Sequence, residues 1–222
     1  MRQSAGPAVT TQPMKRVELG EVPYERTLED MRHWVEERRA GTEGDRLFFL
    51  SHPPVITYGR RTAPGGLPGK MSDIPVIGVD RGGMATYHGP GQLIGYLVMN
   101  IRERGPVDVV RWLETKLVEA LGKLGFETLR RDTPLGGASL AGVWTPDHRR
   151  LVSIGMRIRG GITSHGFALN VDPDLSVFRR FMALGLPDVW MTSLQEICAE
   201  EERRMPSGDE LRDTIAAVLG AQ

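Results

Sequence analysis

The sequence predicts an α+β fold, a single domain with a mixed, largely antiparallel sheet flanked by helices. Residues 141–144, 151–158 and 162–171 are apolar segments separated by short turns, and this spacing indicates antiparallel strand pairing. Helical periodicity is confined to a few segments, and no regular alternation of strand and helix runs along the chain. Such alternation is what a doubly wound parallel sheet requires, so the α+β class is preferred.

The composition limits the class of protein. The chain has 222 residues, of which 40% are hydrophobic, and its 28 basic and 28 acidic residues give a formal net charge of zero. This neutrality gives no electrostatic reason to expect a nucleic-acid or membrane partner, and no apolar run approaches the ~20 residues of a membrane span. A single cysteine excludes an internal disulfide and a cysteine-based zinc site. We therefore expect a cytoplasmic protein without a metal or cofactor.

The N-terminal residues 1–13 contain one arginine and no apolar core, so they do not form a secretory signal. We expect a disordered tail there, with translation starting at Met1 or Met14, and one domain over residues 14–222. A short strand at 16–19 opens that domain. An amphipathic helix follows, because apolar side chains recur at helical spacing before Gly41, namely at Tyr24, Leu28, Met31 and Val35.

Three strands are expected next, at residues 47–50, 55–58 and 75–79. His52 lies between the first two, beside two prolines, where a structural role is more common than a functional one. Arg60 and Arg61 follow the second strand and precede a loop rich in glycine and proline. These two arginines either bind an anionic group or form a solvated pair, and the sequence favours neither.

A glycine-rich segment that leads into a buried strand is the candidate binding site. Residues 81–91 form a predicted loop with several glycines, Tyr87 and His88, and residues 93–101 are almost entirely apolar. Glycine permits positive φ and a close approach of the backbone to a ligand. The apolar run is typical of a strand buried on both faces, which holds such a loop at the edge of a pocket. A tight turn with a surface histidine is the alternative.

The second half of the chain has helices between and after its strands. The helix over residues 106–125 has an apolar stripe consisting of Val107, Val110, Leu113, Leu117, Leu121 and Leu124. Shorter helices are expected at 174–182, after Thr192, and at 209–219. Ser193 with Glu196 and Ser207 with Glu210 have capping-box spacing. His165 suits a pocket position and a structural position equally well.

Five motifs occur in a fixed order along the chain: HPPVITYGR at 52–60, RGGMATYHGPGQLIGY at 81–96, GVW at 142–144, SIGMRIR at 153–159 and ITSHGFALNVDPDL at 162–175. In this order they resemble the motifs of the octanoyl-[acyl carrier protein]:protein N-octanoyltransferases, which are relatives of the lipoate and biotin protein ligases. The likeness extends over residues 18–194. It implies a biotin/lipoate protein ligase-like fold.

The resemblance implies an acyl pocket and a reaction. The reaction moves an octanoyl group from the phosphopantetheine thioester of acyl carrier protein to a lysine of a lipoyl domain, in a 2-oxoacid dehydrogenase or the glycine cleavage H protein. An apolar slot for that chain gains on the order of 0.8 kcal/mol per buried methylene. By resemblance, the pocket residues are Arg81, Gly82, Gly83, Met84, Ala85, Thr86, Tyr87, His88, Ser153, Ile154, Gly155, Gly166, Phe167 and Ala168.

Both catalytic positions of the family are replaced in this chain. The family uses a cysteine nucleophile in a Pro-Cys-Gly element and a lysine just before the strand that carries the SIG motif. Ungapped alignment places Leu184 on the cysteine, and Arg150 stands at the lysine. Leucine cannot form an acyl intermediate. Arginine stays protonated, so it cannot be a general base, although it can hold an oxyanion.

Three functions therefore remain open. The protein is an octanoyltransferase that holds thioester and lysine together and transfers directly, with His88 or His165 as the base. Alternatively, it is a catalytically inactive homologue that binds acyl-carrier protein or a lipoyl domain. The third possibility is an enzyme of the same fold with another acyl donor or acceptor. Cys198, the only cysteine, is better explained as a buried inert thiol than as a relocated nucleophile.

Overall fold

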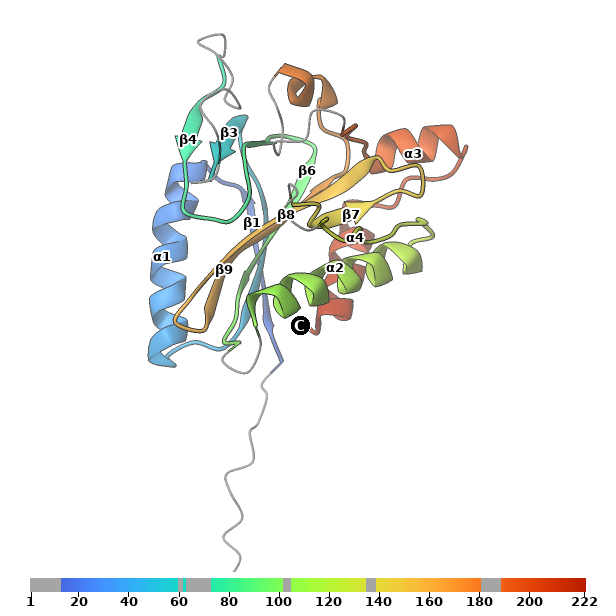
Figure 1. Cartoon of the computed structure of the whole chain (residues 1–222). Coiled ribbons are helices and arrows are strands. Elements are labelled where there is room, and N and C mark those ends of the chain that lie inside the picture. The colour runs from blue at the N-terminus through green and yellow to red at the C-terminus, as the bar shows by residue number, and fades with distance from the viewer. Residues whose placement is uncertain (1–12, 60–61, 63–72, 102–104, 135–138, 181–188) are drawn as a thin grey trace, which may run out of the picture.

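The computed structural model describes residues 13–59, 62, 73–101, 105–134, 139–180 and 189–222 (Figure 1). Residues 1–12, which make up nearly all of the expected tail, lie outside the described residues. So do Arg60, Arg61 and Leu184. No helix in the described part of the chain is long and apolar enough to cross a membrane.

A six-stranded sheet forms the centre of the molecule, and its strands are mixed in direction as the sequence predicts. The first two strands run parallel to each other, and every other neighbouring pair is antiparallel. In spatial order the strands are β1 (Lys15–Glu21), β2 (Arg46–Ser51), β6 (Gln92–Val98), β9 (Ile162–Asn170), β8 (Arg150–Arg159) and β7 (Gly142–Trp144).

A second sheet of three strands was not predicted. Its order is β4 (Val76–Gly78), β3 (Val55–Tyr58) and β5 (Thr86–His88). The last of these lies inside the segment predicted as a loop, and that prediction is wrong for residues 86–88. All three residues of β5 are buried, so the alternation of a surface strand is missing, and only pairing with β3 makes this segment a strand.

The large sheet is covered by helices on both faces, which explains why β6 is buried along its whole length. Alternate residues of β2 and β6 enter two separate core clusters. Leu47 and Leu97 belong to the cluster that α2 (Pro106–Lys123) and α4 (Gly208–Leu219) cover. Phe48 and Tyr96 belong to the cluster that α1 (Tyr24–Ala40) covers. Figure 1 shows α1 on one side of the sheet and α2 with α4 on the other.

The helix at 106–125 is present, but its apolar stripe differs from the prediction in the first turn. Val107 is 62% exposed, whereas Val109 is fully buried. The buried face runs through Val109, Leu113, Leu117 and Leu121, and Val107 points away from it. The tertiary packing of α2 against α4 and the sheet selects this face, and Val107 remains as a surface valine.

The C-terminal helices begin close to the predicted positions. Ser207 and Glu210 form the expected capping box at the start of α4. At α3 (Leu194–Glu200) only half of the box forms: the Ser193 hydroxyl accepts from the backbone N–H of Glu196, but the Glu196 carboxylate accepts from the Thr192 hydroxyl. The helix expected at 174–182 is a short 3₁₀ helix, η2 (Leu175–Arg180).

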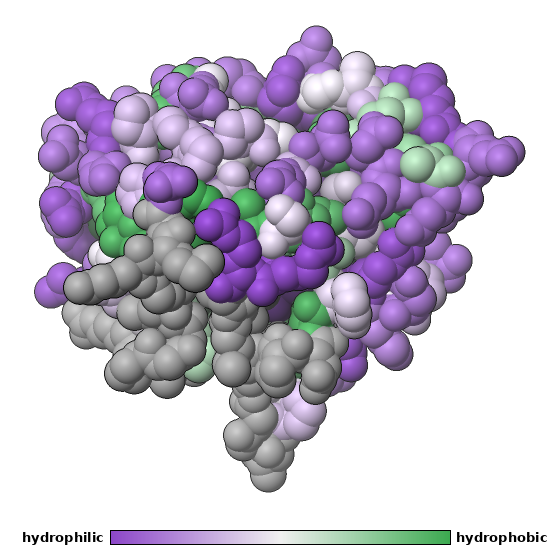
Figure 2. Space-filling model, turned by 90° about the horizontal axis from the view of Figure 1, so that it is seen from above, coloured by the Kyte–Doolittle hydropathy of each residue, from purple (hydrophilic) through white to green (hydrophobic). Residues whose placement is uncertain are grey.

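Most of the surface seen from above in Figure 2 is hydrophilic, with a narrow strip of hydrophobic residues across it. Among the described residues, the large hydrophobic side chains that are exposed are Val76, Val107 and Trp190. The first two are isolated valines, which are common on protein surfaces. Trp190 is 69% exposed and lies next to the start of β8, near Arg150.

Leu113 and Val107, both on α2, give a test of this packing. Leu113 is fully buried, so Leu113→Ala should lower the free energy of unfolding by about 2–5 kcal/mol. Val107→Ala, on the same helix and 62% exposed, should change it by less than about 0.5 kcal/mol. Urea denaturation of both variants measures the difference. Equal losses would mean that the helix face is assigned wrongly.

Candidate active site

A narrow slot lies between β8, β9 and the loop that precedes β5. Its volume is about 30 Å³, which is room for about two water molecules. Antiparallel pairing of β8 and β9 places Ser153 opposite Ala168, Ile154 opposite Phe167, and Gly155 opposite Gly166. These six residues all line the slot, together with Tyr24, Arg81, Gly83, Thr86, His88, Tyr96 and His165.

Most of the pocket residues expected by resemblance line this slot. Arg81 and Gly83 of the loop and Thr86 and His88 of β5 do so, as do all the expected residues of β8 and β9. Four loop residues do not line the slot, namely Gly82, Met84, Ala85 and Tyr87. The ring of Tyr87 instead packs edge-on against Phe178 at 5.6 Å.

Two tyrosines of the slot were not predicted as site residues. Tyr24 was assigned to the apolar stripe of α1, and Tyr96 to a buried strand. A signal was available for Tyr96, because a buried tyrosine needs a hydrogen-bond partner for its hydroxyl and so indicates a polar group nearby. That partner is His52, whose Nε2 lies 2.8 Å from the Tyr96 hydroxyl.

His52 does not line the slot, but it fixes Tyr96, which does. Its Nδ1 lies 2.7 Å from the Val22 carbonyl oxygen, which can only accept, so Nδ1 carries the proton. The Tyr96 hydroxyl therefore donates to Nε2. Burial lowers the pKa of His52 to about 4 and outweighs the Val22 hydrogen bond. The neutral ring fixes the position of Tyr96.

Arg81 attaches the loop to the small sheet. Its guanidinium donates to the carbonyl oxygens of Gly82 at 2.9 Å and Met84 at 3.0 Å, and to the hydroxyl of Thr57 at 2.7 Å. Among the described residues no carboxylate forms an ion pair with it. Burial lowers the pKa of Arg81, but a guanidinium stays protonated at neutral pH. A buried positive charge therefore lies beside the slot.

His88 and His165, the candidate bases, are buried in the slot wall. His88 stacks on Tyr24 with ring centroids 5.8 Å apart, and burial lowers its pKa well below the usual value. His165 Nε2 lies 3.3 Å from a carboxylate oxygen of Asp80, and burial lowers the pKa of His165 to about 3. Within the described chain, neither Nδ1 has a hydrogen-bond partner. Both rings are neutral at pH 7 and are weak bases.

Arg150 lies apart from these histidines. Its guanidinium is buried against the Trp144 ring, 4.6 Å from the centroid, and Nη2 donates to the Ala141 carbonyl. Burial lowers the pKa of Arg150 to about 9, so it is still cationic at neutral pH. Nε and Nη1 have no partner among the described residues. Arg150 does not line the slot, and at ~3.3 Å per residue its Cα lies about 20 Å along β8 from Met156, which faces His165.

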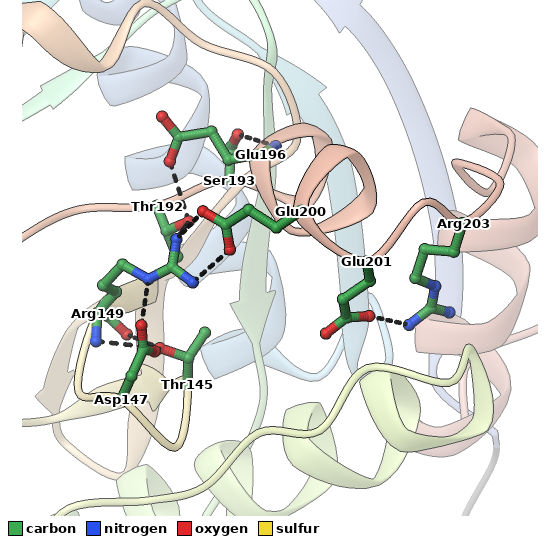
Figure 3. A network of polar contacts seen from close by, with 9 residues as sticks. All are labelled: Thr145, Asp147, Arg149, Thr192, Ser193, Glu196, Glu200, Glu201 and Arg203. Atoms are coloured by element: carbon green, nitrogen blue, oxygen red, sulfur yellow. Dashed lines mark hydrogen bonds and ion pairs between the residues drawn. The ribbon is translucent and has the colours of Figure 1, made fainter.

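The segment after residue 188 is attached to the start of β8. The backbone N–H of Arg150 donates to the Trp190 carbonyl at 2.8 Å, and the N–H of Thr192 donates to the Arg150 carbonyl at 3.0 Å. Arg149 strengthens this attachment: its guanidinium donates to both carboxylate oxygens of Glu200 at 2.7 Å (Figure 3). Residues 190–192 therefore lie at the Arg150 end of the sheet.

Arg149 also fixes the turn between β7 and β8. Its Nε donates to Asp147 at 2.7 Å, and a further contact joins its guanidinium to the Thr192 hydroxyl at 3.3 Å (Figure 3). The bidentate geometry with Glu200 makes this a better defined ion pair than most surface pairs. The turn, the segment at 189–192 and α3 are thereby held as one unit.

Cys198 lies on α3 and does not line the slot. Its side chain is in the main core, with Sγ 3.8 Å from the sulfur of Met205, and the residue is 3% exposed. Burial raises the pKa of the thiol, so the reactive thiolate is disfavoured. The described residues also contain no cluster of acidic, histidine or cysteine side chains suited to a metal ion.

The comparisons with known sequences agree on one family. A family model described as the lipoyl protein ligase A/B catalytic domain matches residues 23–219. An octanoyltransferase of Frankia casuarinae is 45% identical over 194 residues, which are 86% of this chain and 88% of that protein. An octanoyltransferase of Mycobacterium bovis is 39% identical over 209 residues, 92% of this chain and 84% of that protein.

Solved structures show the same fold. A bipartite lipoate protein ligase from Thermoplasma acidophilum superposes with a TM-score of 0.66 at 18% identity, over 95% of this chain and 86% of that chain. A biotin protein ligase from Aquifex aeolicus gives a TM-score of 0.53 at 12% identity, over 94% and 68% of the two chains. At these identities the likeness is evidence for fold only, and it confirms the predicted fold class.

The buried histidines predict how stability changes with pH. The pKa values of His52 and His165 are lowered to about 4 and about 3 in the folded protein. As the pH falls below about 6.5, the unfolded state therefore binds protons first. The free energy of unfolding should be highest above pH 6.5. Between pH 6.5 and pH 4 it should fall by on the order of 2–3 kcal/mol per histidine.

Urea denaturation between pH 7 and pH 4 measures this slope. His52→Gln and His165→Gln should each flatten it, whatever their effect on stability at pH 7. His33→Gln removes a histidine whose side chain is 75% exposed and should leave the slope unchanged. A slope that is the same in all three variants would contradict the assignment of these rings as buried and neutral.

Proposed function

Because the chain belongs to the lipoyl protein ligase A/B catalytic domain family, we propose that it transfers an octanoyl group to a lysine in protein lipoylation. The slot carries this proposal: it is built from the motif residues of β8, β9 and the loop before β5. The 39–45% identity to octanoyltransferases over most of both chains supports the same activity. The acceptor is a lipoyl domain.

The proposed donor is octanoyl-acyl carrier protein, and the proposed acceptors are lipoyl domains of 2-oxoacid dehydrogenases or the H protein of glycine cleavage. The proposed location is the cytoplasm, which suits a chain with one cysteine. Ile154, Phe167 and Ala168 give the slot apolar walls for the alkyl chain. The slot of about 30 Å³ is smaller than an octanoyl chain, so binding moves side chains in its wall.

We place the thioester at the Ser153 end of the slot, toward Arg150. Arg150, which stands at the family's lysine position, lies at this end, and residues 190–192 are hydrogen-bonded to it. Trp190 is 69% exposed there, and exposed tryptophans are enriched in protein contacts. Arg150 is a buried cation near this end, but its guanidinium does not line the slot.

The proposed chemistry is direct transfer. The neutral amine of the acceptor lysine attacks the thioester carbonyl, a C–N bond forms, the C–S bond breaks, and the nitrogen's proton ends on the phosphopantetheine thiolate. Holding both partners in place supplies the rate enhancement that a covalent intermediate supplies in the family. The alternative, with His88 as the base, places the carbonyl at the opposite end of the slot, and the free Nδ1 of His88 is the observation in its favour.

Closing the slot should abolish transfer. A Cβ at Gly155 would lie 3.1 Å from the Arg81 side chain and 3.2 Å from the Gly82 carbonyl oxygen. Gly155→Val should therefore lower octanoylation of a lipoyl domain by roughly 100-fold or more, since misplaced groups cost this much. Gly122→Val is the matched control, because no atom lies within 4 Å of a Cβ built there.

Intact-mass spectrometry of a lipoyl domain incubated with octanoyl-carrier protein measures the product. Cys198→Ser should retain transfer, and its loss would identify Cys198 as a relocated nucleophile. Loss in His88→Ala alone would favour the histidine-base alternative. An unmodified lipoyl domain with tight binding of octanoyl-carrier protein would support the inactive binder instead.

Restoring the family's catalytic pair tests why the chain differs from its relatives. The double variant Leu184→Cys with Arg150→Lys should transfer faster, by roughly 100-fold, because it adds a nucleophile and a base. It should also show an octanoyl adduct on the protein itself in the intact mass, whereas the unaltered chain should show none. An adduct on the unaltered chain would disprove direct transfer.

A further inference from the structure

A larger groove lies beyond the slot and shares one residue with it. The groove has a volume of about 850 Å³, and its apolar floor consists of Leu28, Met31 and Val35 of α1 with Ile162 of β9. We call it the distal groove. His165 lines both the slot and the distal groove and therefore lies where the two cavities adjoin.

The two cavities follow one another along the β8–β9 ladder. The slot spans the pairs from Ser153–Ala168 to Gly155–Gly166, and the distal groove begins at the pair Arg157–Ser164. His165 faces Met156 between them. At ~3.3 Å per residue, His165 lies about 10 Å along the ladder from Ser153. The seven C–C bonds of an octanoyl chain, at about 1.5 Å each, also reach at most about 10 Å.

The ring of His165 is buried and packs edge-on against Tyr96, with ring centroids 6.0 Å apart. Its hydrogen bond to Asp80 is long, 3.3 Å from Nε2, and Nδ1 has no partner within the described residues. Asp80 is itself held by an ion pair with Arg157. The backbone of His165 has φ of 59°, which is uncommon for a residue other than glycine. A side chain held in this way can turn when its carboxylate partner is removed.

We propose that His165, latched by Asp80, ends the acyl slot at eight carbons, and that the distal groove is a second acyl subsite for longer chains. This proposal rests on the proposed function and on the thioester lying at the Ser153 end. Loss of the hydrogen bond between Asp80 and His165 lets the imidazole turn aside. Methylenes beyond the eighth carbon then enter the distal groove and pass over Met31 and Val35. The ligand class of the distal groove is thus the distal part of a ten- to fourteen-carbon acyl chain.

The test is the acyl-length profile of transfer. Octanoyl-, decanoyl-, dodecanoyl- and tetradecanoyl-carrier protein are each offered to a lipoyl domain, and the products are measured by intact mass. The unaltered chain should prefer eight carbons over twelve by about tenfold or more, the scale on which pockets reject extra methylenes. Asp80→Ala should reduce the preference for eight carbons over twelve to about threefold or less. A difference of this size does not require steric exclusion of the longer chain.

Two further variants locate the added methylenes. Val35→Trp places a bulky side chain on the floor of the distal groove, in the path of the added methylenes, so the double variant Asp80→Ala with Val35→Trp should regain the preference for eight carbons. Asp73→Ala removes an exposed aspartate that does not line the groove, and its profile should match that of the unaltered chain. The proposal is overturned if Asp80→Ala leaves the preference for eight carbons unchanged. It is also overturned if the double variant transfers twelve-carbon chains as well as eight-carbon chains.

The same thioesters separate this proposal from the proposed function. If no variant forms any acylated lipoyl domain, octanoyl transfer is wrong, and the length preference is measured instead as the affinity for each acyl-carrier protein. A preference for eight carbons that Asp80→Ala relaxes still supports the latch. Equal affinity of the unaltered chain for eight and twelve carbons overturns it.

Discussion

The close approach of the loop at 81–84 to the glycines of β8 and β9 is the constraint on which the site depends. Gly82 donates its backbone N–H to the Met156 carbonyl at 3.0 Å, and a Cβ at Gly155 would press on the Arg81 side chain. Gly166 has the same role one strand further, where a Cβ would come within 2.1 Å of the Gly95 carbonyl oxygen. Without side chains at these positions, the loop lies on the sheet and a slot remains between them.

The two buried arginines lie in different surroundings. Arg81 lines the slot and forms no ion pair among the described residues, whereas the negative charge of Glu114 partly offsets the effect of burial on the pKa of Arg150. Both guanidiniums donate hydrogen bonds to backbone carbonyl oxygens. Such an arrangement suits groups that acquire negative charge during a reaction. Burial keeps His52, His88 and His165 neutral, and the nearby charge of Arg81 further lowers the pKa values of His88 and His165. Arg81 therefore lies among the neutral groups of the slot, whereas Arg150 lies outside it.

The chain thus combines a slot lined by motif residues with an arginine, Arg150, at the position where the motif comparison expects a lysine. The apolar walls and the glycine row depend on residues that match the octanoyltransferase motifs, whereas Arg150 turns toward Trp144 and Gly142 rather than into the slot. Substituting a nucleophile changes the chemistry of a step without changing the shape that binds the acyl chain. The direct transfer that we propose needs that shape and good positioning of two partner proteins, and the ion pair of Arg149 with Glu200 stabilises the surface where we propose that they meet.

The sequence alone determined the fold class, the strands of the large sheet, the main helices and the loop that carries the site. These features have local signals: apolar runs, helical spacing, glycine pairs and capping residues such as Ser207. The motifs also identified the residues of β8 and β9 that line the slot. Their antiparallel turn sequence fixes which of them face each other.

Only the tertiary structure decided the rest. The strand at Thr86–His88 exists because β3 pairs with it, and Val109 rather than Val107 faces the core because α4 packs there. The sequence also did not show which polar side chains are partners. Tyr96 is hydrogen-bonded to His52, 44 positions away in sequence, and His165 to Asp80, 85 positions away. Periodicity reports which residues are buried, but contacts between distant segments are set by packing, and those contacts give each histidine its charge state and its place in the slot.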